Sequence, residues 1–188
     1  MPPALITRHE AAALSGASPT TVKKAVDQRV IPTRRRRSQS CIEADDVPVL
    51  AMLQLLSEMR LPVRHKREVR RWLRASPGSC ELELTTGLVV RKVEAVEVAG
   101  ERARRYAGLR DRWIVRDPAV KGGEPVIRGT RVGVHTLAAR IAAGESSEVL
   151  AEDFPHISEE AREIAIQYAR ANPRRGRPSH SAPPARAA

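Results

Sequence analysis

Residues 7–28, TRHEAAALSGASPTTVKKAVDQ, contain the signals for two short helices with almost no chain between them. Thr7 and Glu10 have the spacing of a capping box, in which each side chain accepts a hydrogen bond from the other residue's amide. Gly16 permits the left-handed conformation that ends a helix. Ser18, with a proline after it, caps a second helix. The spacing therefore predicts a helix-turn-helix.

The second helix has an apolar face, formed by Val22, Ala25 and Val26, and a polar face. The polar face carries groups that can bond base edges and phosphates, which favours DNA binding over an ordinary helical hairpin with a solvated face.

Four consecutive arginines follow at 34–37, between two short segments of extended character, 30–32 and 40–42. Like charges in such a run repel one another unless anions lie nearby. A small β-wing with a basic tip would place these charges on the phosphate backbone. The pattern predicts a further helix over 43–58. On this interpretation the DNA-binding residues are Ser18, Thr20, Thr21, Lys23, Lys24, Gln28, Arg34, Arg35, Arg36 and Arg37.

The order helix, turn, helix, wing, helix in residues 1–60 resembles the winged DNA-binding domain of MerR-type regulators and excisionase-like proteins. The next segment, 61–111, reads as a connector. It begins with a basic helix over 60–74, whose arginines either follow phosphates or are simply solvated. A hairpin around 85–87 and a mixed-charge helix follow, although Gly100 and Gly108 disfavour the latter.

The segment 117–132, DPAVKGGEPVIRGTRV, is rich in glycine and proline. It is no phosphate-binding loop, because five residues separate Gly123 from Gly129 and Thr-Arg follows in place of Lys-Ser/Thr. We interpret it as a structural turn in which Gly122 and Gly123 adopt positive φ and Gly129 allows a close backbone approach. The residues of this turn are Asp117, Gly122, Gly123, Pro125 and Gly129. Three helices are expected after it, beginning near 134, 147 and 159.

Residues 112–171 are similar to a small helical module of unknown function, with the loop Asp117-Pro118, Gly122-Gly123, Pro125-Val126-Ile127 and Arg128-Gly129-Thr130-Arg131 as its hallmark. The resemblance implies an antitoxin of the VapB type, whose partner is a PIN-like ribonuclease toxin. The residues expected to bind that partner are Arg128, Arg131, Arg174, Arg175 and Arg177.

The segment 173–188 contains arginine and proline but no acid, and we expect it to be a disordered basic tail. Three roles stay open for it: an AT-hook-like minor-groove contact through 175–178, neutralisation of a carboxylate cluster in the toxin, or a solvated tail.

The net charge of +11 suggests an acidic partner, although an arginine-rich composition is weak support by itself. No metal-ligand spacing, cofactor motif or catalytic set is seen, and we expect no enzyme activity, metal or cofactor. With two cysteines that lack CxxC spacing and no run of 18 apolar residues, we expect a cytoplasmic protein without membrane partners.

The fold expected is mainly α with a small β-wing or hairpin: a winged helix-turn-helix over 1–60, a connector over 61–111, a three-helix, helix-turn-helix-like module over 112–172 and the tail. The function expected is an antitoxin that binds operator DNA to repress its operon and that binds and inhibits a PIN-like ribonuclease toxin. We expect a homodimer or a hetero-oligomer with the toxin. The alternative is a stand-alone winged-helix regulator with a C-terminal dimerisation module.

Overall fold

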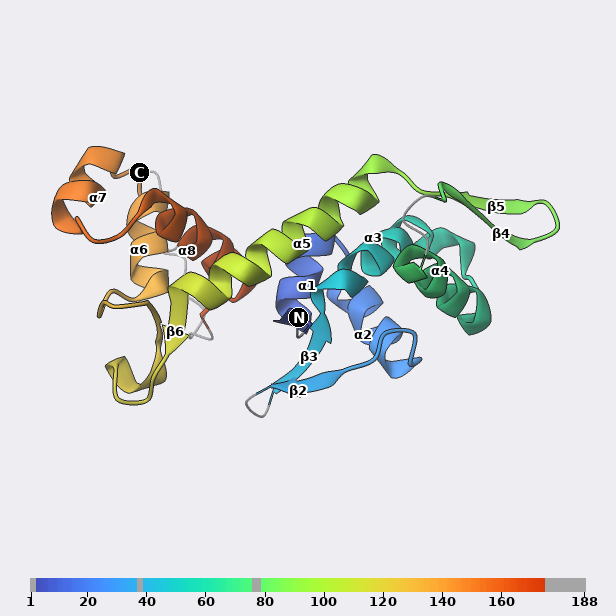
Figure 1. Ribbon diagram of the computed structural model, residues 1–188, viewed down its shortest axis with the longest axis horizontal. Helices are drawn as coiled ribbons and strands as arrows, with labels where there is room; N and C mark the ends of the chain where they lie inside the picture. The colour runs from blue at the N-terminus through green and yellow to red at the C-terminus, as the bar shows by residue number, and fades with distance from the viewer. Residues whose placement is uncertain (1–2, 37–38, 76–78, 175–188) are drawn as a thin grey trace, which may run out of the picture.

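The computed structural model describes residues 3–36, 39–75 and 79–174. One long helix, α5 (Glu94–Trp113), runs through the middle of the molecule (Figure 1). It packs against α1 and α3 along its length and against α8 near its C-terminal end. Gly100 lies where α5 meets α3, because a Cβ placed there would stand 2.7 Å from the Cγ of Pro48. The expected mixed-charge helix is thus confirmed, and Gly100 serves close packing.

The N-terminal lobe, residues 3–60, combines short helices with a small sheet (Figure 1). Its sheet is antiparallel with strand order β1-β3-β2. The elements are β1 (Leu5–Thr7), α1 (Arg8–Ser15), α2 (Pro19–Asp27), β2 (Arg34–Arg36), β3 (Gln39–Glu43), η1 (Ala44–Asp46), α3 (Val47–Leu55) and η2 (Ser57–Met59).

The predicted caps of the first two helices are confirmed. The Thr7 hydroxyl accepts from the Glu10 amide at 3.2 Å, and the Glu10 carboxylate accepts from the Thr7 amide at 2.7 Å. Gly16 has φ +69°, and Ser18 caps α2 by accepting from the Thr21 amide. These motifs were predictable because every group involved lies within four residues of its partner.

The hairpin after α2 differs from the expectation in its boundaries. Residues 30–32 form no strand, and Val30 and Ile31 are instead buried in the core. The strand is formed by Arg34–Arg36, pairing with Cys41, Ser40 and Gln39. Three of the four arginines, Arg34 to Arg36, therefore form strand β2 and pair with β3. Arg37, one of the predicted DNA contacts, lies outside the described residues.

The connector consists of α4 (Val63–Ala75) and the hairpin β4 (Glu81–Thr85) and β5 (Leu88–Arg91). The hairpin projects from the body of the molecule, as Figure 1 shows. Val69 and Trp72 are buried on α4, and Leu84 and Val90 are buried on the hairpin. The predicted basic helix and hairpin are both confirmed.

The C-terminal module, residues 114–172, begins with a small antiparallel pair and continues with three helices. Helix α8 packs on α6, α5 and α1, so the module is joined to the N-terminal lobe. The three helices begin where expected, and Ser146 and Ser158 cap α7 and α8. The elements are β6 (Ile114–Arg116), η3 (Lys121–Gly123), β7 (Pro125–Ile127), α6 (Val134–Ala142), α7 (Ser147–Asp153) and α8 (Glu159–Ala171).

The glycine-rich turn connects β6 to β7. Gly122 and Gly123 have positive φ values of +63° and +84°, as predicted, and Asp117 accepts a hydrogen bond from the Ala119 amide. Pro125 is the first, buried residue of β7. The reason proposed for Gly129 was wrong, since no atom lies within 4 Å of a Cβ placed there. Gly129 is instead suited to its φ of +78°.

The mainly helical fold with small sheets is therefore confirmed. Among the described residues, no helix is both long and apolar enough to span a membrane.

Candidate nucleic-acid interface and the groove between the lobes

The outer face of α2 presents Thr20, Lys23 and Lys24 to solvent. Lys23 forms an ion pair with Asp27 at 2.8 Å, but its side chain is still 72% exposed. The Lys24 side chain makes no ion pair or hydrogen bond with any residue that the structure describes. An exposed cation without an internal partner can meet an external anion at no cost to the fold.

Three other predicted DNA-binding residues on α2 have structural roles. Ser18 caps the helix, and the Thr21 hydroxyl donates to Gln54 Oε1 at 2.9 Å. The Gln28 side chain accepts from Lys66 Nζ at 3.0 Å. These bonds tie α2 to α3 and α4, so the groups left to meet a ligand on this helix are fewer than the sequence implied.

The arginines of β2 are held in part by carboxylates of the same chain. Arg34 donates to Glu43 at 2.8 Å, and Arg36 pairs with Asp111 of α5 at 3.1 Å. Arg35 is exposed and has no such partner among the described residues. The anions that the arginine run requires are thus supplied largely by the fold itself, which leaves Arg35 as the β2 arginine best placed for a phosphate.

Helix α4 shows the same internal pairing, which neither sequence alternative anticipated. Arg70 forms two hydrogen bonds with Asp46, at 2.8 and 3.2 Å, and Arg74 donates to Glu43 at 2.9 Å. Burial tends to raise the pKa of Glu43, but its bonds and charge interactions with Arg34 and Arg74 outweigh this and lower the pKa. Arg70 and Arg74 therefore attach α4 to the N-terminal lobe.

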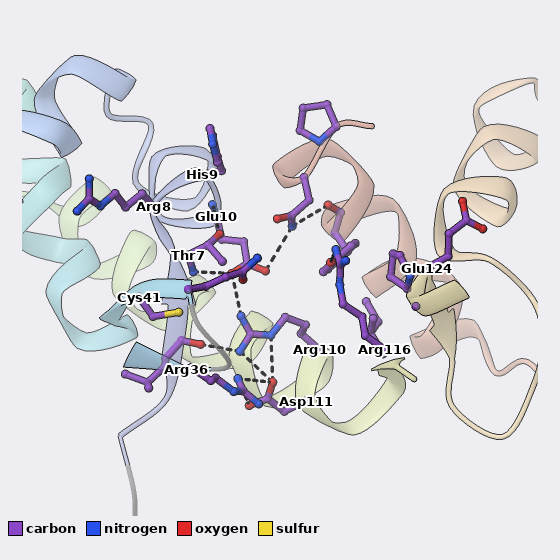
Figure 2. A pocket seen from close by; sticks show the side chains of 18 of the residues that line it. Thr7, Arg8, His9, Glu10, Arg36, Cys41, Arg110, Asp111, Arg116 and Glu124 are labelled. Carbon is purple, nitrogen blue, oxygen red and sulfur yellow. Dashed lines mark hydrogen bonds and ion pairs between the residues drawn. The ribbon is translucent and has the colours of Figure 1, made fainter. Parts of the chain in front are cut away.

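A groove of about 1150 Å³ lies between the N-terminal lobe and the C-terminal module, and Figure 2 shows its lining. We call it the interlobe groove. Arg8, His9 and Arg36 line it from the N-terminal lobe, and Arg116 and Glu124 line it from the module. The glycine-rich turn singled out in the sequence thus forms part of a groove wall.

The floor of this groove holds a buried carboxylate, Glu10, which is 1% exposed. Its Oε1 accepts from Tyr106 at 2.8 Å and from Asn172 at 3.3 Å, and its Oε2 accepts from Arg110 at 2.8 Å as well as from the Thr7 amide. Glu10 therefore links α1, α5 and the end of α8 (Figure 2). The capping-box motif identified this residue but gave no sign of its distant partners.

Burial and the nearby charges shift the ionisation of this cluster. Burial and the Glu10 carboxylate raise the pKa of Tyr106 well above its usual value, so its hydroxyl stays a donor. Burial tends to lower the pKa of Arg110, but the Glu10 and Asp111 charges outweigh it and raise the pKa. The cluster is a buried ion pair whose donors are satisfied within the fold.

The arginines expected to bind a protein partner occupy different environments. Arg128 donates to the carbonyls of Arg112 and Asp111 at 2.6 and 2.9 Å, so it caps the end of α5. Arg174 pairs with Glu124 at 2.9 Å. Arg131 is exposed and has no partner among the described residues. Arg175 and Arg177, with the rest of the expected basic tail, lie outside the described residues.

Groups suited to metal or thiol chemistry are scattered in the described part of the chain. No cluster of three or more His, Cys, Asp or Glu residues there has the geometry to hold a metal ion. Cys41 is buried, Cys80 is exposed, and both are free thiols. Burial, then the charge of Glu10, raises the pKa of Cys41 and so disfavours its reactive thiolate form.

In the comparison with known proteins, a family model matches the C-terminal module. The family model described as "Protein of unknown function (DUF433)" matches residues 114–169. The chain is 44% identical over 79 residues to the uncharacterized protein y4eO of Sinorhizobium fredii (strain NBRC 101917 / NGR234), covering 42% of this chain and 35% of that relative. The chain thus spans about a third of the length of the curated relative it matches.

A likeness also exists to a solved structure, that of Rv2018 from Mycobacterium tuberculosis. The two chains are 18% identical, with 87% of this chain and 97% of that chain covered and a TM-score of 0.38.

Proposed function

We propose that this chain is a sequence-specific DNA-binding regulator that uses the outer face of α2 and the β2–β3 hairpin. The observation that carries the proposal is that Thr20, Lys24 and Arg35 are exposed and unused by the fold, whereas neighbouring polar groups are engaged internally. A threonine hydroxyl and a lysine ammonium on a short helix are groups that read base edges. An arginine on a hairpin beside that helix suits the phosphate backbone.

The order of elements supports this proposal. Helices α1 and α2 are joined by a turn at Gly16 and are followed by a two-stranded hairpin and α3. On our proposal this lobe is a winged helix-turn-helix, with α2 as the recognition helix. The α2–α3 and α2–α4 hydrogen bonds of Thr21 and Gln28 would hold the recognition helix at a fixed angle.

Selection from a pool of random duplexes tests this function. We expect an enriched motif for the wild-type chain, and a loss of preference at one base position for Thr20→Ala. Arg102 on α5 is exposed and has no partner among the described residues, so Arg102→Ala is a matched control that should keep the motif. Recovery of no motif by wild-type protein would contradict sequence-specific binding.

We further propose that the C-terminal module gives the regulator its antitoxin role, by binding and inhibiting a PIN-like ribonuclease, as its sequence resemblance implies. Arg131 supports this, because it is an exposed cation without an internal partner in the module. Co-expression with the candidate toxin from the same genome tests it: growth should be rescued by the wild type and less by Arg131→Glu. The alternative is that the module only mediates dimerisation, in which case no ribonuclease co-purifies and the chain is dimeric alone.

A further inference from the structure

A second concave region lies beside the proposed DNA-binding face, between α2, the end of α3 and the start of α4. It has a volume of about 510 Å³. We call it the amphipathic groove, because it combines apolar and cationic side chains. Its lining residues are Thr21, Lys24, Ala25, Gln28, Leu53, Leu56, Ser57, Arg60, Leu61 and Lys66.

The apolar part of the lining is anchored in the core. Ala25, Leu53 and Leu61 are buried, and Leu56 is half-buried. Such side chains form a rigid apolar surface that a ligand can meet without reorganising the fold. Two large apolar side chains on the same elements remain open to solvent, Leu55 at 59% exposure and Met59 at 48%. They adjoin lining residues in the sequence, Leu55 before Leu56 and Met59 before Arg60, but neither lines the groove itself.

The charged side chains that line the groove are all positive. Lys24, Arg60 and Lys66 are cationic, and no carboxylate among the residues that the structure describes lines the groove. Lys66 donates to the neutral amide of Gln28, and neither Lys24 nor Arg60 forms an ion pair with any residue in the described ranges. The two acids that adjoin lining residues in the sequence, Asp27 and Glu58, are exposed and absent from the lining, and Asp27 pairs with Lys23. The positive charge of the groove is therefore not neutralised by the fold.

This combination distinguishes the amphipathic groove from the DNA-binding face. Phosphates would satisfy the cations but would leave the leucines of the lining without a partner, since DNA interfaces are markedly polar. A helix with apolar residues at i, i+3, i+4 and i+7 and carboxylates beside them would satisfy both kinds of group. We propose that the amphipathic groove is a docking site for an acidic amphipathic helix of a protein partner.

Lys24 gives this site a regulatory consequence. It lines the groove and also lies on the α2 face that we assign to DNA. A helix seated in the groove therefore competes with DNA for the same ammonium group. Only this competition depends on the proposed function; docking of the helix does not.

The probe for docking is a labelled synthetic helix with leucine at i, i+3, i+4 and i+7 and glutamate at the flanking positions. Two companion peptides carry lysine in place of glutamate, or serine in place of leucine. We expect fluorescence anisotropy to show saturable binding of the first peptide and binding at least about tenfold weaker for each companion, as loss of charge or apolar complementarity implies.

The protein variants localise the binding. Arg60→Glu should weaken binding of the glutamate peptide about tenfold or more. Leu56→Glu, which changes the half-buried leucine of the lining, should do the same. Arg102→Glu makes the same charge change away from the groove and should bind as the wild type does. Thermal unfolding followed by circular dichroism establishes that each variant is folded.

The outcomes separate the two proposals. Equal binding of all three peptides, no saturable binding, or equal loss in Arg60→Glu and Arg102→Glu overturns the docking site. If the chain binds no DNA but binds the glutamate peptide in an Arg60-dependent way, the docking site is upheld and only the proposed function is refuted. Displacement of a bound duplex by the glutamate peptide, and not by the serine peptide, supports both.

Discussion

Glu10→Gln is the substitution that best tests how the N-terminal lobe is held to the rest of the molecule. The Glu10 carboxylate accepts from four donors: the Thr7 amide, Tyr106, Arg110 and Asn172. The glutamine side chain has one oxygen and one NH₂ group, whereas both oxygens of Glu10 accept hydrogen bonds. In either orientation of the glutamine, the NH₂ group therefore faces donors with which it cannot bond. Arg110, which is 8% exposed, also loses the charge opposite it and keeps Asp111 and a backbone carbonyl.

The expected loss of stability follows from this geometry. Removing one partner of a buried ion pair costs about 3–5 kcal/mol, because the other charge stays buried. For a chain of this size about 1 kcal/mol lowers the melting temperature by about 2–4 °C, so we expect a decrease of about 6–20 °C. Tyr106→Phe removes a single donor and should cost about 1–3 kcal/mol.

Thermal and urea unfolding followed by circular dichroism measure these losses. The control is Glu81→Gln, which removes the charge from an exposed pair with Arg91, whose side chains are 50% and 75% exposed. Such a pair contributes at most about 1 kcal/mol. If Glu10→Gln destabilised the protein no more than the control does, the buried cluster would not hold the lobes together and the reasoning would be refuted.

Three further predictions concern single side chains. Gly100→Ala should destabilise the protein by about 1–3 kcal/mol, because its Cβ would meet Pro48. Gly108→Ala on the same helix has open space around its Cβ and should stabilise the protein by about 0.5–1 kcal/mol. The opposite order of stabilities in urea unfolding would contradict the α5–α3 packing. Gly129→Val should cost about 1–2 kcal/mol through its positive φ, and Gly129→Asn clearly less, as melting temperatures would show. Burial, then the charge of Arg174, lowers the pKa of His135 below 6.5 in the folded protein. As the pH falls through 6.5, His135 is therefore protonated more readily in the unfolded chain than in the folded one, and the protein loses stability. His135→Gln should reduce this loss, and an unchanged pH profile of the melting temperature would contradict the prediction.

The sequence predicted local structure well wherever a motif carried its own partners. The caps at Thr7 and Ser18 and the positive φ of Gly122 and Gly123 involve neighbours within a few residues, so the interactions that form them can be inferred from the sequence. Helix α5 was harder to predict, because helix propensity penalises Gly100 and packing against Pro48 overrides that penalty.

The candidate site was predicted less completely, because charge in a sequence does not reveal its partner. The run 34–37 suggested external phosphates, and the arginines of α4 were expected either to follow phosphates or to be solvated. Arg34 and Arg74 instead share the carboxylate of Glu43. Arg128 stands in the most distinctive motif of the module and still serves to cap α5. Only contacts between residues far apart in the chain separate such structural arginines from Arg35, which the fold leaves unpaired among the residues described.

The measurement that tests the central claim most directly is the salt dependence of duplex binding for wild type, Arg35→Ala, Lys24→Ala and the control Arg102→Ala. We expect the logarithm of the wild-type affinity to fall linearly with the logarithm of salt concentration, with a slope smaller by about 0.9 in Arg35→Ala for the one lost phosphate contact. Lys24→Ala should weaken binding to the selected motif by about 1–3 kcal/mol more than to a scrambled duplex, and Arg102→Ala should match the wild type. Equal slopes and affinities in all four proteins would contradict the claim that α2 and β2 form the DNA-binding surface.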